Sequence, residues 1–355
     1  MSDRFFHFGS YRPTLAQELL LQASLLKEKA ALTAWEQWRS SVDIEVLDAE
    51  SYVLLPQLYQ NLLAHGVEDP HMARLKGIYR RNWCANQLQI KALTTLLSHL
   101  KSGGIEVIVL GDVALSHIEN YRSISSLHFL VRAAEIENTI QRLTGVNWHI
   151  SPALAQTPIH LQDVQEHSLY LQGHLFWAIP QDYTDEEVWH YATPNGDDLP
   201  GWRLSPTDQF LNGCARTFFK SSSPQIYGIA DAIMLIRKSG NDLDWMRLIT
   251  QAQRYQLILP VRNMLILLHK VFQYSAPSWV LPALCQMPIA QAEWLNYQVL
   301  ASDQRSWVRS TIAQSLYPLS HLETQLLHLR HRPFPGRQVL KSLLKPKKSA
   351  LELGE

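Results

Sequence analysis

The sequence has few cysteines, and their arrangement excludes two classes of protein. The 355 residues contain three cysteines, Cys84, Cys214 and Cys285, and no two of them form a CxxC pair. An odd number of scattered thiols fits neither a disulfide framework nor a zinc ribbon. Free thiols are typical of reducing compartments, so we expect a cytoplasmic protein. Cys84 lies in a helical segment and is predicted to be a buried core residue.

Net charge and long apolar runs are missing as well. The chain balances 32 basic against 32 acidic side chains, so we do not expect nucleic acid to be the main partner. The longest apolar run, residues 257–268, is interrupted by Arg262 and Asn263 and is too short to cross a bilayer. The first residues show no basic stretch followed by an apolar one, so neither a signal peptide nor a membrane partner is expected.

Apolar and aromatic residues are abundant, whereas glycine is scarce. Hydrophobic residues make up 46% of the chain, which has 11 tryptophans and only 15 glycines. This balance favours packed helices over a glycine-punctuated β-sandwich. At about 100–200 residues per domain, the length predicts two domains or three small ones.

Helical spacing of apolar residues dominates the first hundred positions. Three helices are predicted there: residues 15–26, a segment anchored by Trp35 and Trp38, and residues 49–64. A longer helix is predicted from Pro70 to Leu100, because proline favours a first helical turn and Ser102-Gly103-Gly104 would end it. We assign residues 1–100 to an N-terminal helical domain.

The pattern changes between residues 101 and 200, where an α/β core is expected. Short β-branched and apolar runs predict three strands, at residues 105–110, 126–131 and 169–177. Helical segments are predicted between them, at residues 114–120 and 134–143. Together these elements predict a small mixed sheet.

Helices are predicted again from Ser205-Pro206 to about Leu329, which defines a C-terminal helical domain of residues 201–329. Residues 330–355 form a tail whose first part, 330–348, carries seven Lys/Arg and no acid. A solubilising end or a docking segment for phosphate or a partner both fit this composition, and the tail is a minor exception to the exclusion of nucleic acid. The expected fold class is α+β, predominantly helical, with a small mixed sheet flanked by two helical domains.

Several segments match known family motifs in a fixed order. Residues 54–62 (LLPQLYQNL) resemble "LLPLLYRNL", residues 104–110 resemble the start of "GIPVLVLKG", and Arg122 to Val131 resembles "RPMSDLDLLV". Leu204-Ser205-Pro206 with Asp208, and later Leu243-Asp244-Trp245, resemble the family's C-terminal helical part. Over roughly residues 45–275 the chain resembles the uncharacterised bacterial nucleotidyltransferases of the DNA polymerase β-like superfamily.

The resemblance implies a particular site. In that superfamily a glycine-containing turn after one strand holds the triphosphate, and paired aspartates on the next strand bind Mg²⁺ together with a third aspartate from a neighbouring strand. The corresponding nucleotide-binding candidates in this chain are Gly111, Asp112 and Arg122. The resemblance also points to a cleft with His174 and Arg216, and Arg80 and Arg81 would either face its phosphates or pair with acids on the surface.

The departures from the family pattern concern the metal ligands. Ser126 and His128 stand where the family has its paired aspartates, and Gln172 stands where it has the third. Gly111-Asp112 replaces the family's Lys-Gly, and Arg216 replaces a histidine. Mg²⁺ requires hard, anionic oxygen ligands, which these side chains lack. We therefore expect a nucleotidyltransferase fold that has lost catalysis, needs no cofactor and binds a protein partner, with a nucleotide as a weaker possibility.

Three alternatives remain open at this stage. An active enzyme would transfer a nucleotidyl group from an NTP to a small molecule or peptide, with Mg²⁺ held by shifted ligands such as Asp112, Glu106 or Glu119. His128 and His174 on neighbouring strands would suit a transition metal, although no third ligand is evident. In the last alternative the motif matches are accidental and the chain is an unrelated helical scaffold.

Overall fold

The structure is a computed structural model, and it describes part of the chain. The described residues are 12–111, 113–114, 124–151, 158–176, 185–196, 199–219, 225–294 and 297. All of them belong to one compact unit, Met1–Ser306. Most of the helix predicted at residues 114–120, and the whole basic tail, lie outside the described residues.

The N-terminal part is helical, as predicted. Its helices are α1 (Leu15–Leu25), α2 (Glu28–Ser41), α3 (Ala49–Val53), α4 (Leu55–Ala64) and α5 (His71–Ser102). A capping box starts α1, where the Thr14 hydroxyl accepts the Gln17 N–H and the Gln17 side chain accepts the Thr14 N–H. The single helix predicted over 49–64 is divided at Leu54, because Pro56 has no N–H with which to continue the helical hydrogen bonding.

A mixed seven-stranded sheet follows among the described residues. Its strands are β1 (Ile108–Leu110), β2 (Leu127–Leu130), β3 (His149–Ile150), β4 (Ile159–Gln162), β5 (Ser168–Gln172), β6 (Thr193–Pro194) and β7 (Trp202–Arg203), in the order β3-β4-β5-β2-β1-β7-β6. The central pair β1–β2 is antiparallel, whereas β2–β5 and β1–β7 are parallel. The three predicted strands are present but shorter, and β3, β4, β6 and β7 were not predicted because segments of two to four residues show no clear alternation.

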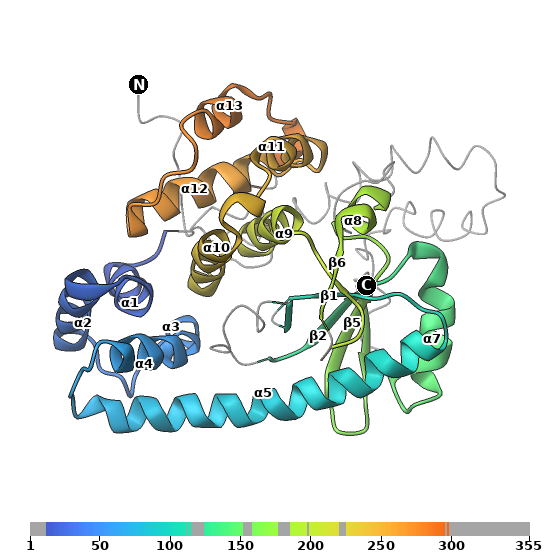
Figure 1. Cartoon of the computed structure of the whole chain (residues 1–355), viewed down its shortest axis with the longest axis horizontal. Helices are drawn as coiled ribbons and strands as arrows, with labels where there is room; N and C mark the ends of the chain where they lie inside the picture. The colour runs from blue at the N-terminus through green and yellow to red at the C-terminus, as the bar shows by residue number, and fades with distance from the viewer. Residues whose placement is uncertain are drawn as a thin grey trace, which may run out of the picture. The chain divides into compact units, whose positions relative to one another are not determined.

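Further helices lie along the described part of the chain after the first strands, and Figure 1 shows several of them beside the sheet. They are α7 (Ile136–Thr144, preceded by the 3-10 turn η3, Ala133–Glu135), α8 (Glu186–Tyr191), α9 (Pro206–Phe219), α10 (Ile226–Ser239), η4 (Gly240–Asp242), α11 (Trp245–Arg254), α12 (Ile258–Phe272) and α13 (Val280–Gln286). These elements and the mixed sheet confirm the predicted α+β, mainly helical class. Within the described residues, no helix is both long enough and apolar enough to cross a membrane.

Strand alternation separates two hydrophobic cores. Val109, Phe129 and Leu171 point to one face of the sheet, where they pack with the C-terminal half of α5 and with α7. Leu110 and Leu130 point to the opposite face and join a larger core built by helices α1–α4 and α9–α13. Residues from the predicted N-terminal and C-terminal domains thus share one core, and the domain boundaries at residues 100, 200 and 329 stay a prediction.

Helix α5 contributes to both cores and is the long helix drawn beneath the sheet and the N-terminal helices in Figure 1. Its first turns bury Leu75 and Ile78 in the larger core, and its last turns bury Leu93 to Leu100 in the sheet core. The turns between them are largely exposed. Cys84 lies there and is exposed, so the prediction of a buried thiol was wrong, because among the described residues neither hydrophobic core extends over this side of the helix.

The joint between β1 and β7 generates a stability prediction. Gly201 has φ +96, and a Cβ there would lie 2.9 Å from the Val107 carbonyl oxygen, which accepts the Trp202 N–H at 2.8 Å. We expect Gly201→Ala to lower the free energy of unfolding by about 2–4 kcal/mol, because the cost of the positive φ adds to that of the steric clash with the Val107 carbonyl oxygen. Gly66 also has positive φ but has nothing within 4 Å of its Cβ position, so Gly66→Ala should cost only about 1 kcal/mol. If urea denaturation showed the same loss of stability for Gly201→Ala and Gly66→Ala, this account would be wrong.

Candidate functional site

The side chains at the expected carboxylate positions lie on one face of the sheet. In β2 and β5 the register pairs His128 with Tyr170 and Leu130 with Gln172. Because side chains alternate along a strand, Ser126, His128 and Gln172 all point to the face that carries α9 and α10. The sheet therefore brings together the three positions that the family resemblance singled out.

Ser126 and His128 bind each other. The Ser126 hydroxyl and the Nε2 atom of His128 are 3.0 Å apart, and both side chains are half-buried. The His128 ring also stacks on Tyr170, with ring centroids 4.8 Å apart, and Tyr170 stacks in turn on His160 at 4.7 Å. Hydroxyl, imidazole and phenol groups thus line this part of the face.

Tyr170 and His160 are members of the site that the sequence did not reveal. Each becomes a neighbour of His128 only through strand register, since β5 lies between β2 and β4. A second serine–histidine pair closes the row, with His160 Nε2 at 3.1 Å from the Ser168 hydroxyl.

Gln172 has a structural task at the end of β5. Its side chain is only 5% exposed. The amide nitrogen donates to the carbonyl oxygens of His174 at 2.9 Å and of Leu175 at 3.1 Å. Both of its N–H groups are consumed in fixing the loop that follows the strand, a task that an aspartate, which has no donor, cannot perform.

Arg216 reaches from α9 to the end of β1. Gly111 ends that strand with φ +71, and a Cβ there would lie 3.0 Å from Nη1 of Arg216 and 3.2 Å from Cδ2 of His128. Glycine is therefore required on two grounds, the backbone conformation and the close approach of two side chains. Gly111 and Arg216 border a cavity of about 40 Å³, together with Asp231 of α10, and this volume suits a few water molecules.

His174 pairs with a carboxylate that the sequence analysis did not single out. Its Nδ1 atom lies 3.3 Å from Oδ2 of Asp185, the residue before α8. The same oxygen accepts the Leu175 N–H at 3.0 Å. Burial raises the pKa of Asp185, and the Leu175 hydrogen bond and nearby His174 partly offset that rise. The pair anchors the loop after β5 beside the carbonyls that Gln172 holds.

The structure describes only three of the other predicted site residues, Glu106, Arg80 and Arg81. Asp112, Arg122 and Glu119 lie outside the described residues. Glu106 is exposed and pairs with Arg132 at 3.6 Å, and it precedes β1, at the end of that strand opposite to Gly111. Arg80 and Arg81 are exposed on α5.

The described side chains on this face do not form a donor set that fits Mg²⁺. In the part of the chain that the structure describes, no three His, Cys, Asp or Glu side chains are grouped so as to hold one. Ser126, His128 and Gln172 supply no negative charge, which Mg²⁺ requires of its ligands. The ring of Tyr170 separates His128 from His160, so these two imidazoles cannot share an ion.

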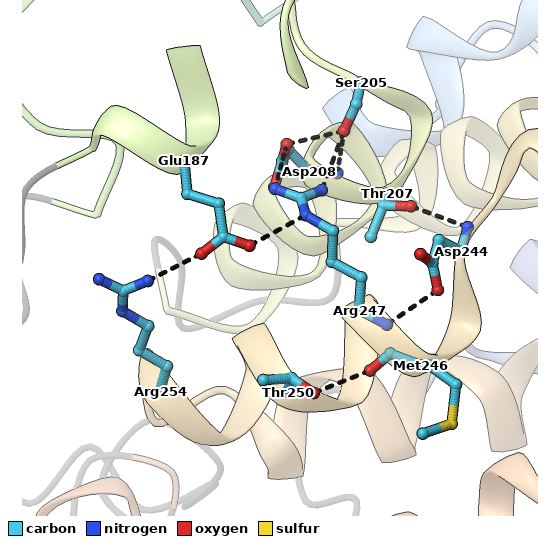
Figure 2. Close-up of polar contacts among 9 residues, drawn as sticks. All are labelled: Glu187, Ser205, Thr207, Asp208, Asp244, Met246, Arg247, Thr250 and Arg254. Atoms are coloured by element: carbon cyan, nitrogen blue, oxygen red, sulfur yellow. Dashed lines mark hydrogen bonds and ion pairs between the residues drawn. The ribbon is translucent and has the colours of Figure 1, made fainter. Parts of the chain in front are cut away.

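A buried ion cluster lies behind the site, at the junction of α8, α9 and α11 (Figure 2). The guanidinium of Arg247 donates to both oxygens of Asp208 at 2.9 Å, and to Glu187 and Ser205 at 3.2 Å. The side chains of Arg247 and Asp208 are 8% and 1% exposed. Burial raises the pKa of Asp208, while Arg247 favours its ionised form.

Asp244 ties the same cluster to the start of α11. Its side chain accepts the Arg247 N–H at 2.9 Å, and its own N–H donates to the Thr207 hydroxyl at 3.0 Å. Asp244 is therefore the N-cap residue of α11. The motifs around Ser205 and Asp244 therefore build the frame that carries α9, and with it Arg216.

Removing the charge of Arg247 alone should destabilise the protein more than removing the charges of both Arg247 and Asp208. We expect Arg247→Met to lower the free energy of unfolding by about 3–5 kcal/mol, because it leaves the Asp208 carboxylate buried without a counter-charge. The double variant Arg247→Met/Asp208→Asn should recover much of the loss. Chemical denaturation of both variants measures the difference, and a double variant less stable than the single one would refute this reading of the pair.

Comparisons with known proteins identify a family for this chain. A sequence profile of a family described as an uncharacterised nucleotidyltransferase matches residues 49–273. Among solved structures, an antigenic nucleotidyltransferase-like protein from Paracoccidioides brasiliensis is similar at 14% identity and a TM-score of 0.38, over 57% of this chain and 95% of that one. No curated protein matches the chain. Because the family match extends over more than half of its length, the chain belongs to the family of uncharacterised nucleotidyltransferases.

Proposed function

We propose that this protein has lost metal-dependent nucleotidyl transfer and acts as a binding or accessory protein on a nucleotidyltransferase fold. The observation that carries the proposal is the side chain of Gln172. It stands at a position where the family resemblance implies a metal-binding aspartate, and both of its N–H groups are bound to backbone carbonyls.

The Ser126–His128 pair supports the same conclusion. A side chain that binds Mg²⁺ has to present lone pairs of an anionic oxygen toward the ion. Here the Ser126 hydroxyl is bound to His128, which in turn stacks on Tyr170. The pair is held by partners within the sheet and contributes no charge that would balance a metal and a triphosphate.

The proposed role is binding without a metal. Most of the helices are longer than the strands of the sheet, so a protein partner that docks on helical faces is the expected ligand. A small ligand in the cleft near Arg216 is the weaker expectation. We expect this binding to occur in the cytoplasm, as the scattered free thiols indicate.

Nucleotide binding can be tested directly on the whole chain. We expect ATP, GTP, CTP and UTP to leave the melting temperature unchanged, whether Mg²⁺, Mn²⁺ or EDTA is added, because the ligands that would hold a metal–triphosphate complex are missing. A ligand that binds only the native state raises the melting temperature by mass action. A shift that requires the metal would contradict the proposal and would turn the search toward an acceptor substrate and shifted ligands such as Asp112.

A second prediction concerns Gln172 itself. Gln172→Glu keeps the shape of the side chain but removes both donors and places a carboxylate against two carbonyl oxygens. We expect it to lower the free energy of unfolding by about 2–5 kcal/mol. Gln141→Glu, an exposed position on α7, serves as the charge-matched control and should change stability by less than about 0.5 kcal/mol.

The result separates a structural glutamine from a residual metal site. If Gln172→Glu is as stable as the parent protein, or gains stability when Mg²⁺ is added, the position still serves a metal and the proposed loss of function is wrong.

A further inference from the structure

All the Lys, Arg, Asp and Glu residues of helix α5 are basic. Its 32 residues include six Lys or Arg and no Asp or Glu: Arg74, Lys76, Arg80, Arg81, Lys91 and Lys101. The chain as a whole is balanced, whereas this helix carries only positive charges. Like charges three or four residues apart repel one another along a helix, and this arrangement therefore weakens α5 when it is considered alone.

Most of these basic residues share one exposed face with two large apolar side chains. The α5 stripe, as we call it, consists of Lys76, Arg80, Arg81, Trp83, Cys84, Gln87, Leu88 and Lys91. Its central line runs at helical spacing from Lys76 to Lys91, in steps of three or four residues. Trp83 is 46% exposed and Leu88 is 72% exposed.

Within the part of the chain that the structure describes, this face of α5 belongs to neither hydrophobic core. Between Ile78, in the larger core, and Leu93, in the sheet core, the only buried residue of α5 is Asn86. Asn86 points away from the stripe and accepts the Ile124 N–H at 2.9 Å. The stripe therefore spans the part of α5 that connects the two cores, and its side chains are not needed to hold either of them.

The charges of the stripe are also uncompensated. Elsewhere on the same helix Arg74 pairs with Glu45. Among the residues that the structure describes, Lys76, Arg80, Arg81 and Lys91 have no acidic partner. Exposed cations beside an exposed tryptophan and leucine combine the two features that recognition surfaces use, an apolar anchor and a charged rim.

We propose that the α5 stripe binds an acidic amphipathic helix of a partner protein. From Lys76 to Lys91 the stripe rises about 22 Å, which is the length of a four-turn helix. Carboxylates at helical spacing on the partner would complement the cations, and its apolar residues would cover Trp83 and Leu88. The balanced net charge of the chain argues against a nucleic acid as the occupant, since long-range attraction to a polyanion depends on excess positive charge.

This inference rests on the binding role proposed above, for which it names the class of partner. The two can fail separately. The stripe is tested without nucleotide or metal, and the loss of catalysis is tested without any partner.

The experiment uses the full chain and a synthetic probe. The probe is a fluorescent helical peptide of about 18 residues with Glu on one face and Leu on the other, and binding is followed by anisotropy. We expect Arg80→Glu/Arg81→Glu to weaken binding at least about tenfold through charge reversal. Trp83→Ala should weaken it by a similar factor, because the apolar anchor is lost. The control is Lys27→Glu/Lys29→Glu, which reverses two exposed charges outside the stripe and should leave the affinity unchanged.

Several outcomes would overturn the proposal. The peptide could fail to bind the parent protein, or the control variant could lose as much affinity as the stripe variant, which would indicate non-specific attraction. Preferential binding of a single-stranded RNA or of phosphatidylserine vesicles through the same arginines would assign the stripe to a different partner. Circular dichroism and melting temperatures of all variants confirm that they fold.

Discussion

The alternation of side chains along three short strands is the constraint on which this molecule depends. In β1, β2 and β5 every second residue enters the sheet core, and the residues between them face α9 and α10. A shift of one residue in register would exchange the two sets. It would place His128 and Gln172 in the apolar core and Phe129 and Leu171 in the site. Both the stability of the sheet and the content of the site follow from the same pairing.

Polar side chains around the site have become structural. Gln172 fixes the loop after β5, Asp185 holds that loop from the α8 side, and Arg247 joins Asp208 to Glu187 behind it. Each of these groups is satisfied by protein partners, as buried polar groups must be. An arrangement that uses its donors and charges internally holds a fixed shape, which is what the proposed binding role requires.

Helix α5 joins the two cores and leaves its middle turns uncovered. A helix of this length is stabilised by packing at both ends, so its exposed central residues, unlike the buried Asn86, are free to vary without loss of the fold. Exposed basic and aromatic residues collect where that freedom exists. The surface that the chain offers to a partner is therefore a consequence of how α5 connects the cores.

Local signals in the sequence determined a large part of this structure. Apolar spacing predicted the long helix α5 and the pieces that became α1, α2, α4 and α9 to α12, because helical periodicity and capping depend on residues close together in the chain. The order of the motifs identified the family, and residue identity alone showed that Ser126, His128 and Gln172 supply no negative charge to bind Mg²⁺.

The tertiary structure decided the remaining features, because they depend on contacts between residues far apart in the sequence. The stacking of Tyr170 between two histidines depends on strand register, and the exposure of Cys84 depends on what packs over α5. The partners of Gln172 depend on how the loop after β5 folds back. Each of these contacts is set by the packing of distant segments, which no window of sequence contains.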